Sequence, residues 1–192
     1  MGGLVRELTE LGIICRLGDI NHDVVPERRS YFERWLSNRD GFIRLIATNI
    51  DYIGIEEVMR MGAFFDVHCL IENEFVSEND DNSYTLFQAS PFFTLRNGVL
   101  ESLGWSGGVL ADILSKDQIL SEFIRKSIME EQTRRISVRV ANFACIIQTR
   151  IWEYHELTSI FNILDRIALN IKKLTGQIHL GETISICTRS TD

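Results

Sequence analysis

The stretch from Pro26 to Asp51 reads PERRSYFERWLSNRDGFIRLIATNID, and it leads from an amphipathic helix directly into an apolar strand. Pro26 ends a preceding strand, Ser30 is suited to cap the helix, and apolar residues recur on one side of it until about Asp40 and Gly41. The strand then covers residues 42–48. This helix-to-strand unit is the part of the sequence from which the fold is best predicted.

A basic turn opens that helix, and it consists of Arg28, Arg29, Ser30 and Tyr31. Guanidinium groups, hydroxyls and free backbone amides at a helix start are the donors that hold a phosphate group. The sequence therefore predicts an anion site at these four residues. The alternative is a solvated helix start, where the helix dipole is slightly unfavourable to the two arginines.

A second polar group, Thr48, Asn49 and Asp51, stands at the end of the predicted strand 42–48. Short polar side chains at strand ends are well placed to meet a ligand, because pockets often form there. The alternative is a turn in which Asn49 or Asp51 bonds to its own backbone.

A third polar group, Thr149 and Arg150, follows the apolar run 143–147, which the pattern places on a helix. Arg150 would then lie at the end of a buried face, where it could reach a pocket or a partner chain. The alternative is an arginine whose stem lies along the protein surface and whose charge stays in water.

The pattern of the whole chain divides it into two parts. Residues 1–112 have β character, with Asn97-Gly98 as the strongest hairpin signal and a looser turn over 104–108. Residues 113–192 have helical character and form a helical C-terminal part packed on the first. We further predict strands over 11–17, 65–75, 84–89 and 91–95, a hairpin closing at 24–25, a short helix near 53–62, and helices from 115–118, over 136–154 and over 156–174, the last ended by Gly176.

Composition excludes several classes of function. The 192 residues carry a formal net charge of −7, which disfavours a sequence-independent grip on nucleic acid. No run approaches the roughly 18 apolar residues that span a membrane, and the charged Arg6 and Glu7 do not resemble a signal peptide. We therefore expect a cytoplasmic protein with neither a nucleic-acid nor a membrane partner.

Cysteines and histidines give no sign of a metal or a nucleophile. The four cysteines are widely spaced, without a CxxC motif, and are expected to be mostly buried free thiols. The four histidines do not converge in the sequence, so no metal-ligand pair arises. The sequence predicts no catalytic residue and no metal site. The cysteines are Cys15, Cys69, Cys145 and Cys187; the histidines are His22, His68, His155 and His179.

Four short motifs, taken in order, resemble a mostly archaeal family of uncharacterised proteins related to flavin reductases. They are Leu11-Gly12-Ile13-Ile14, Arg29-Ser30-Tyr31, the strand end Leu45 to Asp51, and Ala144 to Arg150, which a helix ending in Lys172 to Gly176 follows. Members of that family adopt an FMN-binding split β-barrel with a helical C-terminal part. The resemblance thus implies an α+β split barrel.

The resemblance also implies a cofactor, FMN. Its phosphate would fall to Arg29 and Ser30, with Tyr31 beside them, and the second and third polar groups would border the flavin. Proteins of this kind generally work as homodimers with flavin at the interface. Such a protein needs no catalytic acid or base of its own, because the flavin supplies the redox chemistry. The resemblance therefore implies an FMN-binding flavoprotein of unknown substrate, with flavin-dependent oxidoreduction as its expected activity.

Two departures from the family favour an alternative. Residues 6–10 carry charges where the family has Asn-Ala-Ala-Pro, and Ile147 stands where the family has a histidine. Carboxylates near a flavin would oppose its binding. The alternative is a flavin-free dimeric barrel that binds another anionic small molecule or a protein partner.

Overall fold

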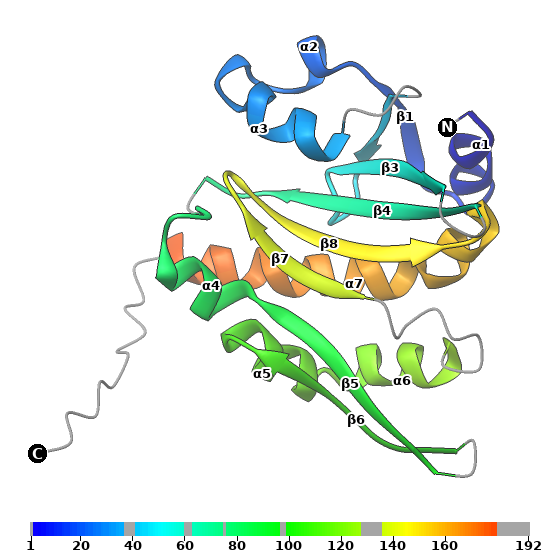
Figure 1. The fold of residues 1–192 in the computed structure, drawn as a ribbon, viewed down its shortest axis with the longest axis vertical. Coiled ribbons are helices and arrows are strands. Elements are labelled where there is room, and N and C mark those ends of the chain that lie inside the picture. Colours follow the sequence, from blue (N-terminus) through cyan, green and yellow to red (C-terminus); the bar gives the residue numbers. More distant parts are fainter. Residues whose placement is uncertain are drawn as a thin grey trace, which may run out of the picture.

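The computed structural model describes residues 2–36, 41–59, 63–74, 76–96, 99–127 and 136–179. Within them the chain forms seven helices and one eight-stranded sheet (Figure 1). The expected α+β class is confirmed. The elements are α1 (Gly2–Glu10), β1 (Ile14–Gly18), α2 (Ile20–Asp23), α3 (Pro26–Leu36), β2 (Phe42–Ile46), β3 (Tyr52–Met59), β4 (Ala63–Glu72), α4 (Asp81–Phe87), β5 (Ala89–Arg96), β6 (Val99–Gly107), α5 (Val109–Lys116), α6 (Gln118–Ser127), β7 (Ser137–Ala141), β8 (Ala144–Ile151) and α7 (Tyr154–His179).

The sheet has the order β1-β2-β3-β4-β8-β7-β5-β6, and all neighbours are antiparallel. β8 pairs with β4 from Phe65↔Ile151 to Glu72↔Ala144. β7 meets β5 at Ala89↔Val138, after which the β5–β6 hairpin extends away from the body (Figure 1). The sheet therefore crosses the expected boundary at residue 112, because β7 and β8 belong to its centre.

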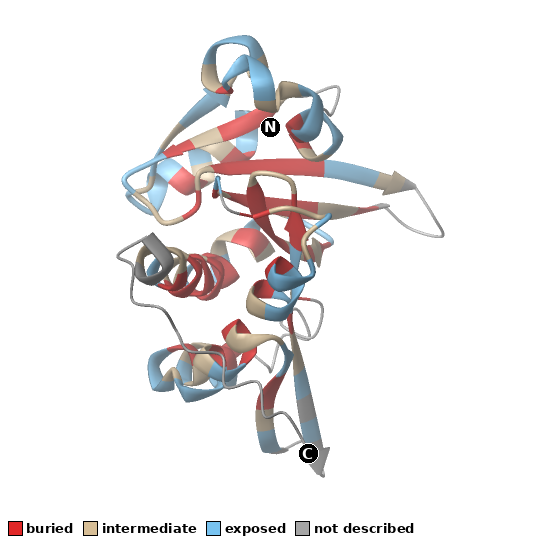
Figure 2. Ribbon diagram, turned by 90° about the vertical axis from the view of Figure 1, so that its left-hand side faces the viewer, coloured by how far each residue is buried: buried red, intermediate tan, exposed pale blue. Residues whose placement is uncertain are grey.

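The main core lies between one face of the sheet and the helices α1, α5, α6 and α7. α7 packs against β4 and β8, and Figure 2 shows that the buried residues concentrate in this helix and the sheet beside it. Apolar residues three and four positions apart give α7 one continuous buried face. That face includes Leu157, Ile160, Leu164, Ile167, Ile171 and Leu174, and it packs with strand residues that include Ile53, Val67, Cys69 and Ile147.

A second, smaller core lies under α3 on the opposite face of the sheet. Phe32 and Leu36 of α3 pack with Phe42 and Tyr52. The helix approaches the sheet backbone so closely that a Cβ on Gly54 would lie 2.1 Å from the Trp35 carbonyl oxygen. Glycine at position 54 is thus a requirement of the way α3 is seated.

Several predicted elements are confirmed. The strand at 42–48 is β2, the strand at 65–75 is β4, the helix from 115–118 is α6 and the helix at 156–174 is α7. β5 and β6 pair up to Arg96↔Val99, as the hairpin prediction requires, while Asn97 and Gly98 lie outside the described residues. Cys69 and Cys145 are buried free thiols and Cys15 is a half-buried one; Cys187 lies outside the described residues.

Predictions in the first half of the chain were wrong where a short apolar run fits two periods. The helix expected near 53–62 is the strand β3, and the hairpin expected between 17 and 25 is the turn and helix α2. The strand expected at 84–89 is mostly helix α4, which Asp80 caps by accepting a hydrogen bond from the Asn82 amide. Helix α1 was not predicted, although its Leu4 and Leu8 are fully buried.

In the second half, the helix expected over 136–154 is the hairpin of β7 and β8. Its run Cys145-Ile146-Ile147 is buried on both faces of the sheet, so it lacks the alternation that marks a half-exposed strand. The turn expected over 104–108 mostly belongs to β6, and α5 follows directly. α7 continues through Gly176, because packing of its apolar face outweighs the low helix propensity of one glycine.

Candidate functional site

The predicted basic turn lies inside α3 rather than before it. The helix begins at Pro26, a residue favoured at the first helical position. The backbone amide of Arg28 donates to the Val25 carbonyl at 3.0 Å, so it is not free for an anion. Ser30 stands one turn inside the helix and does not cap it.

Both arginines of that turn are bonded within the chain. Arg28 Nη2 lies 2.5 Å from a Glu74 carboxylate oxygen, and its Nη1 lies 3.9 Å from Glu72. Arg29 donates to the backbone carbonyls of Val24 at 3.1 Å and Asn21 at 2.5 Å. These bonds hold α3 to α2 and to the end of β4, so the two guanidinium groups have a structural use.

Tyr31, the last residue of the basic turn, is partly exposed. Its ring meets the Phe143 ring edge to face, at 5.3 Å between centroids. The Arg28 guanidinium also lies over the Phe143 ring, at 5.4 Å from its centroid. The aromatic contact thus joins α3 to the turn between β7 and β8.

The second polar group fastens the turn between β2 and β3 to α7. The amide and side chain of Asn49 donate to the two Asp165 carboxylate oxygens at 2.7 and 2.8 Å. Lys172 lies 3.0 Å from Asp51, and the Thr48 hydroxyl donates to the Ile50 carbonyl at 2.8 Å. The polar atoms of this group thus face the helix and the turn itself.

Thr149 and Arg150 lie on strand β8 and point to opposite faces of the sheet. Thr149 faces the main core, where its hydroxyl has no hydrogen-bond partner. Arg150 binds Asp66 through two hydrogen bonds of 2.6 and 3.1 Å and covers the Phe64 ring. Adjacent residues on a strand cannot border the same ligand from one side.

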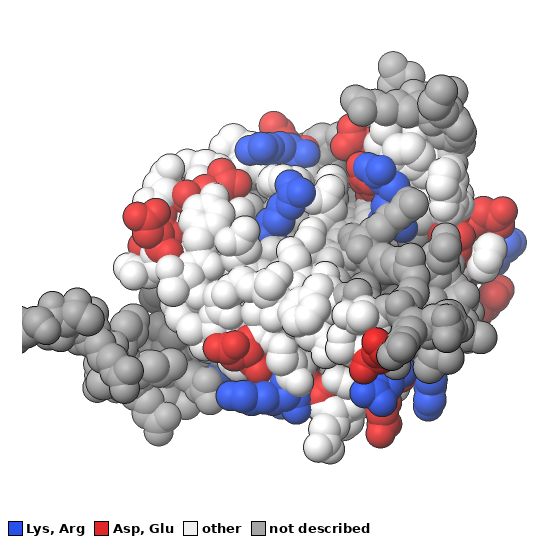
Figure 3. Space-filling model, turned by 60° about the horizontal axis from the view of Figure 1, so that its bottom comes forward, with Lys and Arg blue, Asp and Glu red and all other residues white. Residues whose placement is uncertain are grey.

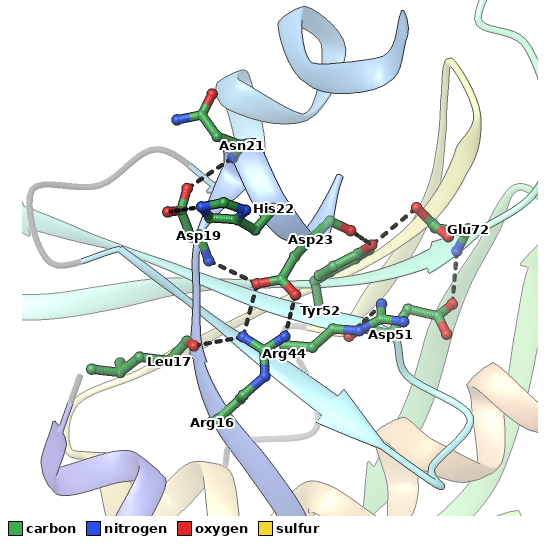
Figure 4. A network of polar contacts seen from close by, with 10 residues as sticks. All are labelled: Arg16, Leu17, Asp19, Asn21, His22, Asp23, Arg44, Asp51, Tyr52 and Glu72. Carbon is green, nitrogen blue, oxygen red and sulfur yellow. Dashed lines mark hydrogen bonds and ion pairs between the residues drawn. The ribbon is translucent and has the colours of Figure 1, made fainter. Parts of the chain in front are cut away.

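The first and second groups meet in one charged network, which we call the α3 network. Figure 4 shows the part of it around Tyr52, without Arg28 and Glu74. The Tyr52 hydroxyl lies 2.9 Å from the Asp23 carbonyl and 3.1 Å from Glu72. The Glu72 amide donates to Asp51 at 2.9 Å. The network consists of Arg16, Asp23, Arg28, Arg44, Asp51, Tyr52, Glu72 and Glu74.

The ionisation of this network suits a structural clamp. The hydrogen bond from Arg16 lowers the pKa of Asp23, so this carboxylate stays charged. Burial, and then the Glu72 carboxylate, raise the pKa of the Tyr52 phenol, so it stays a neutral donor. Arg44 covers the Tyr52 ring at 4.4 Å and donates to the Asp51 carbonyl at 3.4 Å. Charges of both signs are thus matched inside the network.

A cleft of about 490 Å³ lies where the end of α3 meets α4, the start of β5 and β7. We call it the Arg34–Arg139 cleft. Its polar lining comes from segments far apart in the sequence. It includes Arg34, Trp35, Glu78, Tyr84, Gln88, Ser90, Ser137 and Arg139.

The two arginines of the cleft differ from those of the α3 network. Arg34 lies over the Trp35 ring at 4.9 Å. Among the residues that the structure describes, no ion pair joins Arg34 or Arg139 to a carboxylate. Sequence reasoning missed this pair, because Arg139 was placed on a helix and only the sheet brings β7 beside α3.

Two other hollows are less suited to a ligand. One of about 470 Å³ lies by α5, α6 and α7, but its Asp117 already binds Arg166 and Asn170. One of about 340 Å³ lies between α6 and α7 and includes Phe123 and Lys126. Neither contains two cations without carboxylate partners among the described residues.

The described residues offer no metal cluster, and their two buried thiols are poor nucleophiles. They contain no group of three potential metal ligands. Burial raises the pKa of the Cys69 thiol to about 12, and it raises the pKa of Cys145 as well. A thiol with a raised pKa is a poor nucleophile at neutral pH.

Surface charge and helix length bear on larger partners. On the face shown in Figure 3, positive and negative side chains are interspersed around a broad uncharged area. Among the described residues, no helix has both the length and the apolar character that crossing a bilayer requires. Comparisons with protein-family models, with curated proteins and with solved structures gave no match.

Proposed function

We propose that this protein binds a small anionic molecule in the Arg34–Arg139 cleft. The observation that carries the proposal is the pair of guanidinium groups without a carboxylate partner among the described residues, in a cleft that also presents hydroxyl groups. Arginine binds carboxylate and phosphate groups through two parallel hydrogen bonds. Those two groups are therefore the anions we expect.

Size and charge restrict the ligand further. A cleft of about 490 Å³ falls within the range of small-molecule sites. Glu78 lines the same cleft and repels a densely charged ligand such as a triphosphate. We therefore expect a ligand with one carboxylate or phosphate group and a neutral, hydrogen-bonding remainder that can meet Tyr84 and Ser90.

FMN is one member of this ligand class, and a flavin-bound split barrel acting as a homodimer is the finer form of the proposal. The resemblance assigned the phosphate to Arg29 and Ser30, whereas the two arginines that lack a carboxylate partner among the described residues favour the cleft. A yellow purified protein with flavin absorbance would support the finer form. A colourless protein that binds other anions would support the flavin-free alternative.

Calorimetric titration with FMN and with sodium sulfate tests the proposal. Arg34→Gln and Arg139→Gln should each weaken binding by about tenfold or more, since a charge-assisted hydrogen bond contributes about 1.5–3 kcal/mol. Arg125→Gln, which alters an exposed arginine of α6 outside the cleft, is the matched control. Absence of binding by the wild type, or equal binding by all variants, would refute the site.

A further inference from the structure

A row of three polar side chains leads from the centre of the sheet to the cleft. His68 of β4 stands opposite Gln148 of β8, and Gln148 stands opposite Ser137 of β7. Directly opposed residues on antiparallel strands lie on the same face and within contact distance. Ser137 lines the Arg34–Arg139 cleft, so the row joins that cleft to a buried imidazole.

His68 is held tightly at the inner end of the row. Its side chain is buried, with only 5% of the residue exposed. Its ring meets the Trp35 ring edge to face at 5.2 Å, and the Trp35 backbone favours the protonated form of the ring. His68 therefore contacts the same tryptophan that forms a wall of the cleft.

Gln148, in the middle of the row, has an unsatisfied acceptor. Its Oε1 atom is buried and has no hydrogen-bond partner. A neutral imidazole has a single N–H group. A protonated imidazole has a second N–H group, which is the donor that Gln148 Oε1 lacks.

Charged groups on β3, β4, β7 and α3 lie near His68. Asp66 of β4 and Glu56 of β3 favour the protonated ring, and Arg139 of β7 disfavours it. Burial is the largest effect, and it lowers the pKa of His68 below its usual value of 6.5. Arg34 of α3 adds a further cation beside Trp35. Because Arg139 also lines the cleft, an anion bound there would offset the Arg139 repulsion, which adds to the effect of burial on the pKa of His68.

We propose that anion binding in the cleft is coupled to proton uptake by His68, through Arg139 and through the row of His68, Gln148 and Ser137. This inference rests on the function proposed above. Coupling is reciprocal: if a bound anion promotes protonation of His68, protonation of His68 must tighten binding of the anion by the same factor. The protein then holds its ligand more tightly in acid than at neutral pH.

Sulfate is the probe for this test, because it stays a dianion throughout the range in which histidine titrates. NMR would follow the His68 imidazole signal from about pH 5 to about pH 8 with and without saturating sulfate, at constant ionic strength. We expect sulfate to raise the titration midpoint. The sulfate Kd should become smaller as the pH is lowered. Its total decrease should be about tenfold for each pH unit by which sulfate raises the midpoint.

His68→Asn should abolish the pH dependence of the sulfate Kd, whereas His155→Asn, which alters an exposed histidine of α7, should retain it. The wild-type midpoint shift needs no variant, so the test survives if His68→Asn does not fold. Sulfate binding without a shift of the His68 midpoint, or with unchanged pH dependence in a folded His68→Asn, refutes the coupling and leaves the proposed function intact. No sulfate binding at any pH refutes the proposed function, and the coupling with it.

Discussion

The α3 network and the Arg34–Arg139 cleft lie at two ends of the same helix and use arginine in opposite ways. In the network, Arg28 binds Glu74 and Arg29 binds backbone carbonyls, so both guanidinium groups are already hydrogen-bonded within the protein. In the cleft, neither Arg34 nor Arg139 forms an ion pair among the described residues. A cluster of basic residues in sequence is thus a weaker sign of a site than cations that folding leaves unpaired.

The substitution expected to have the largest effect disrupts the close packing of α3 on the sheet at Gly54, on which both regions depend. Gly54→Val places a side chain against the Trp35 carbonyl, where even a Cβ would lie at 2.1 Å. Because a backbone atom cannot move aside as a flexible side chain can, we expect a loss of about 3 kcal/mol or more in the free energy of unfolding. Urea titration measures it. Gly176→Ala, whose Cβ meets nothing within 4 Å, should be neutral or slightly stabilising; equal effects would show that α3 is not seated as described.

Exchanging arginine for glutamine in each region should give opposite results. Arg139→Gln should lower sulfate affinity by about tenfold while changing the free energy of unfolding by less than about 0.5 kcal/mol. Arg28→Gln should leave sulfate affinity unchanged and lower stability by about 1 kcal/mol, since the side chain is largely buried between Glu72 and Glu74. Calorimetry and urea unfolding on both variants check the pair. A loss of sulfate affinity in Arg28→Gln would indicate that the anion binds at the basic turn and not in the cleft.

Removing one hydroxyl group tests whether the α3 network contributes to the stability of the protein. Tyr52→Phe keeps the ring under Arg44 but removes the hydrogen bonds to the Asp23 carbonyl and to Glu72. We expect a loss of about 1 kcal/mol in stability, measured by urea unfolding, with sulfate affinity intact. A stability equal to the wild type would mean that water replaces the phenol without loss.

The two regions should also respond to acid in opposite directions. Because the folded pKa of Asp23 lies below its usual value of 3.8, its contribution to stability is full above that value and disappears as the pH falls through the folded pKa. Anion affinity in the cleft should instead rise as the pH falls. Urea unfolding of wild type and Asp23→Asn between about pH 5 and about pH 2 checks the first trend. A pH dependence as steep in Asp23→Asn as in the wild type would contradict it.

The sequence was most informative where local pattern and burial agree. Residues 42–48 and the helical spacing of Ile160, Leu164, Ile167 and Ile171 predicted β2 and α7 correctly. Prediction failed for 53–59 and 144–151, because a short run of Val and Ile buried in the middle of a sheet also suits a buried helix. Their neighbours in the sheet, which come from distant parts of the chain, decide between the two.

The candidate site was less predictable than the fold, for a related reason. The basic turn was visible in the sequence, but its partners Glu72 and Glu74 are not, since they approach only when β4 lies beneath α3. Arg34 and Arg139 carry no shared motif. They line one cleft only because of where α3 and β7 lie in the folded protein.

By itself, the sequence determined the α+β class, the free buried thiols Cys69 and Cys145, and the long final helix, because composition and apolar periodicity act through local geometry. Only the tertiary structure decided the strand order, the packing of α3 against Gly54 and which of the described arginines lack a carboxylate partner. Those features depend on contacts between distant segments: a guanidinium is available to a ligand only after folding has settled which carboxylates reach it.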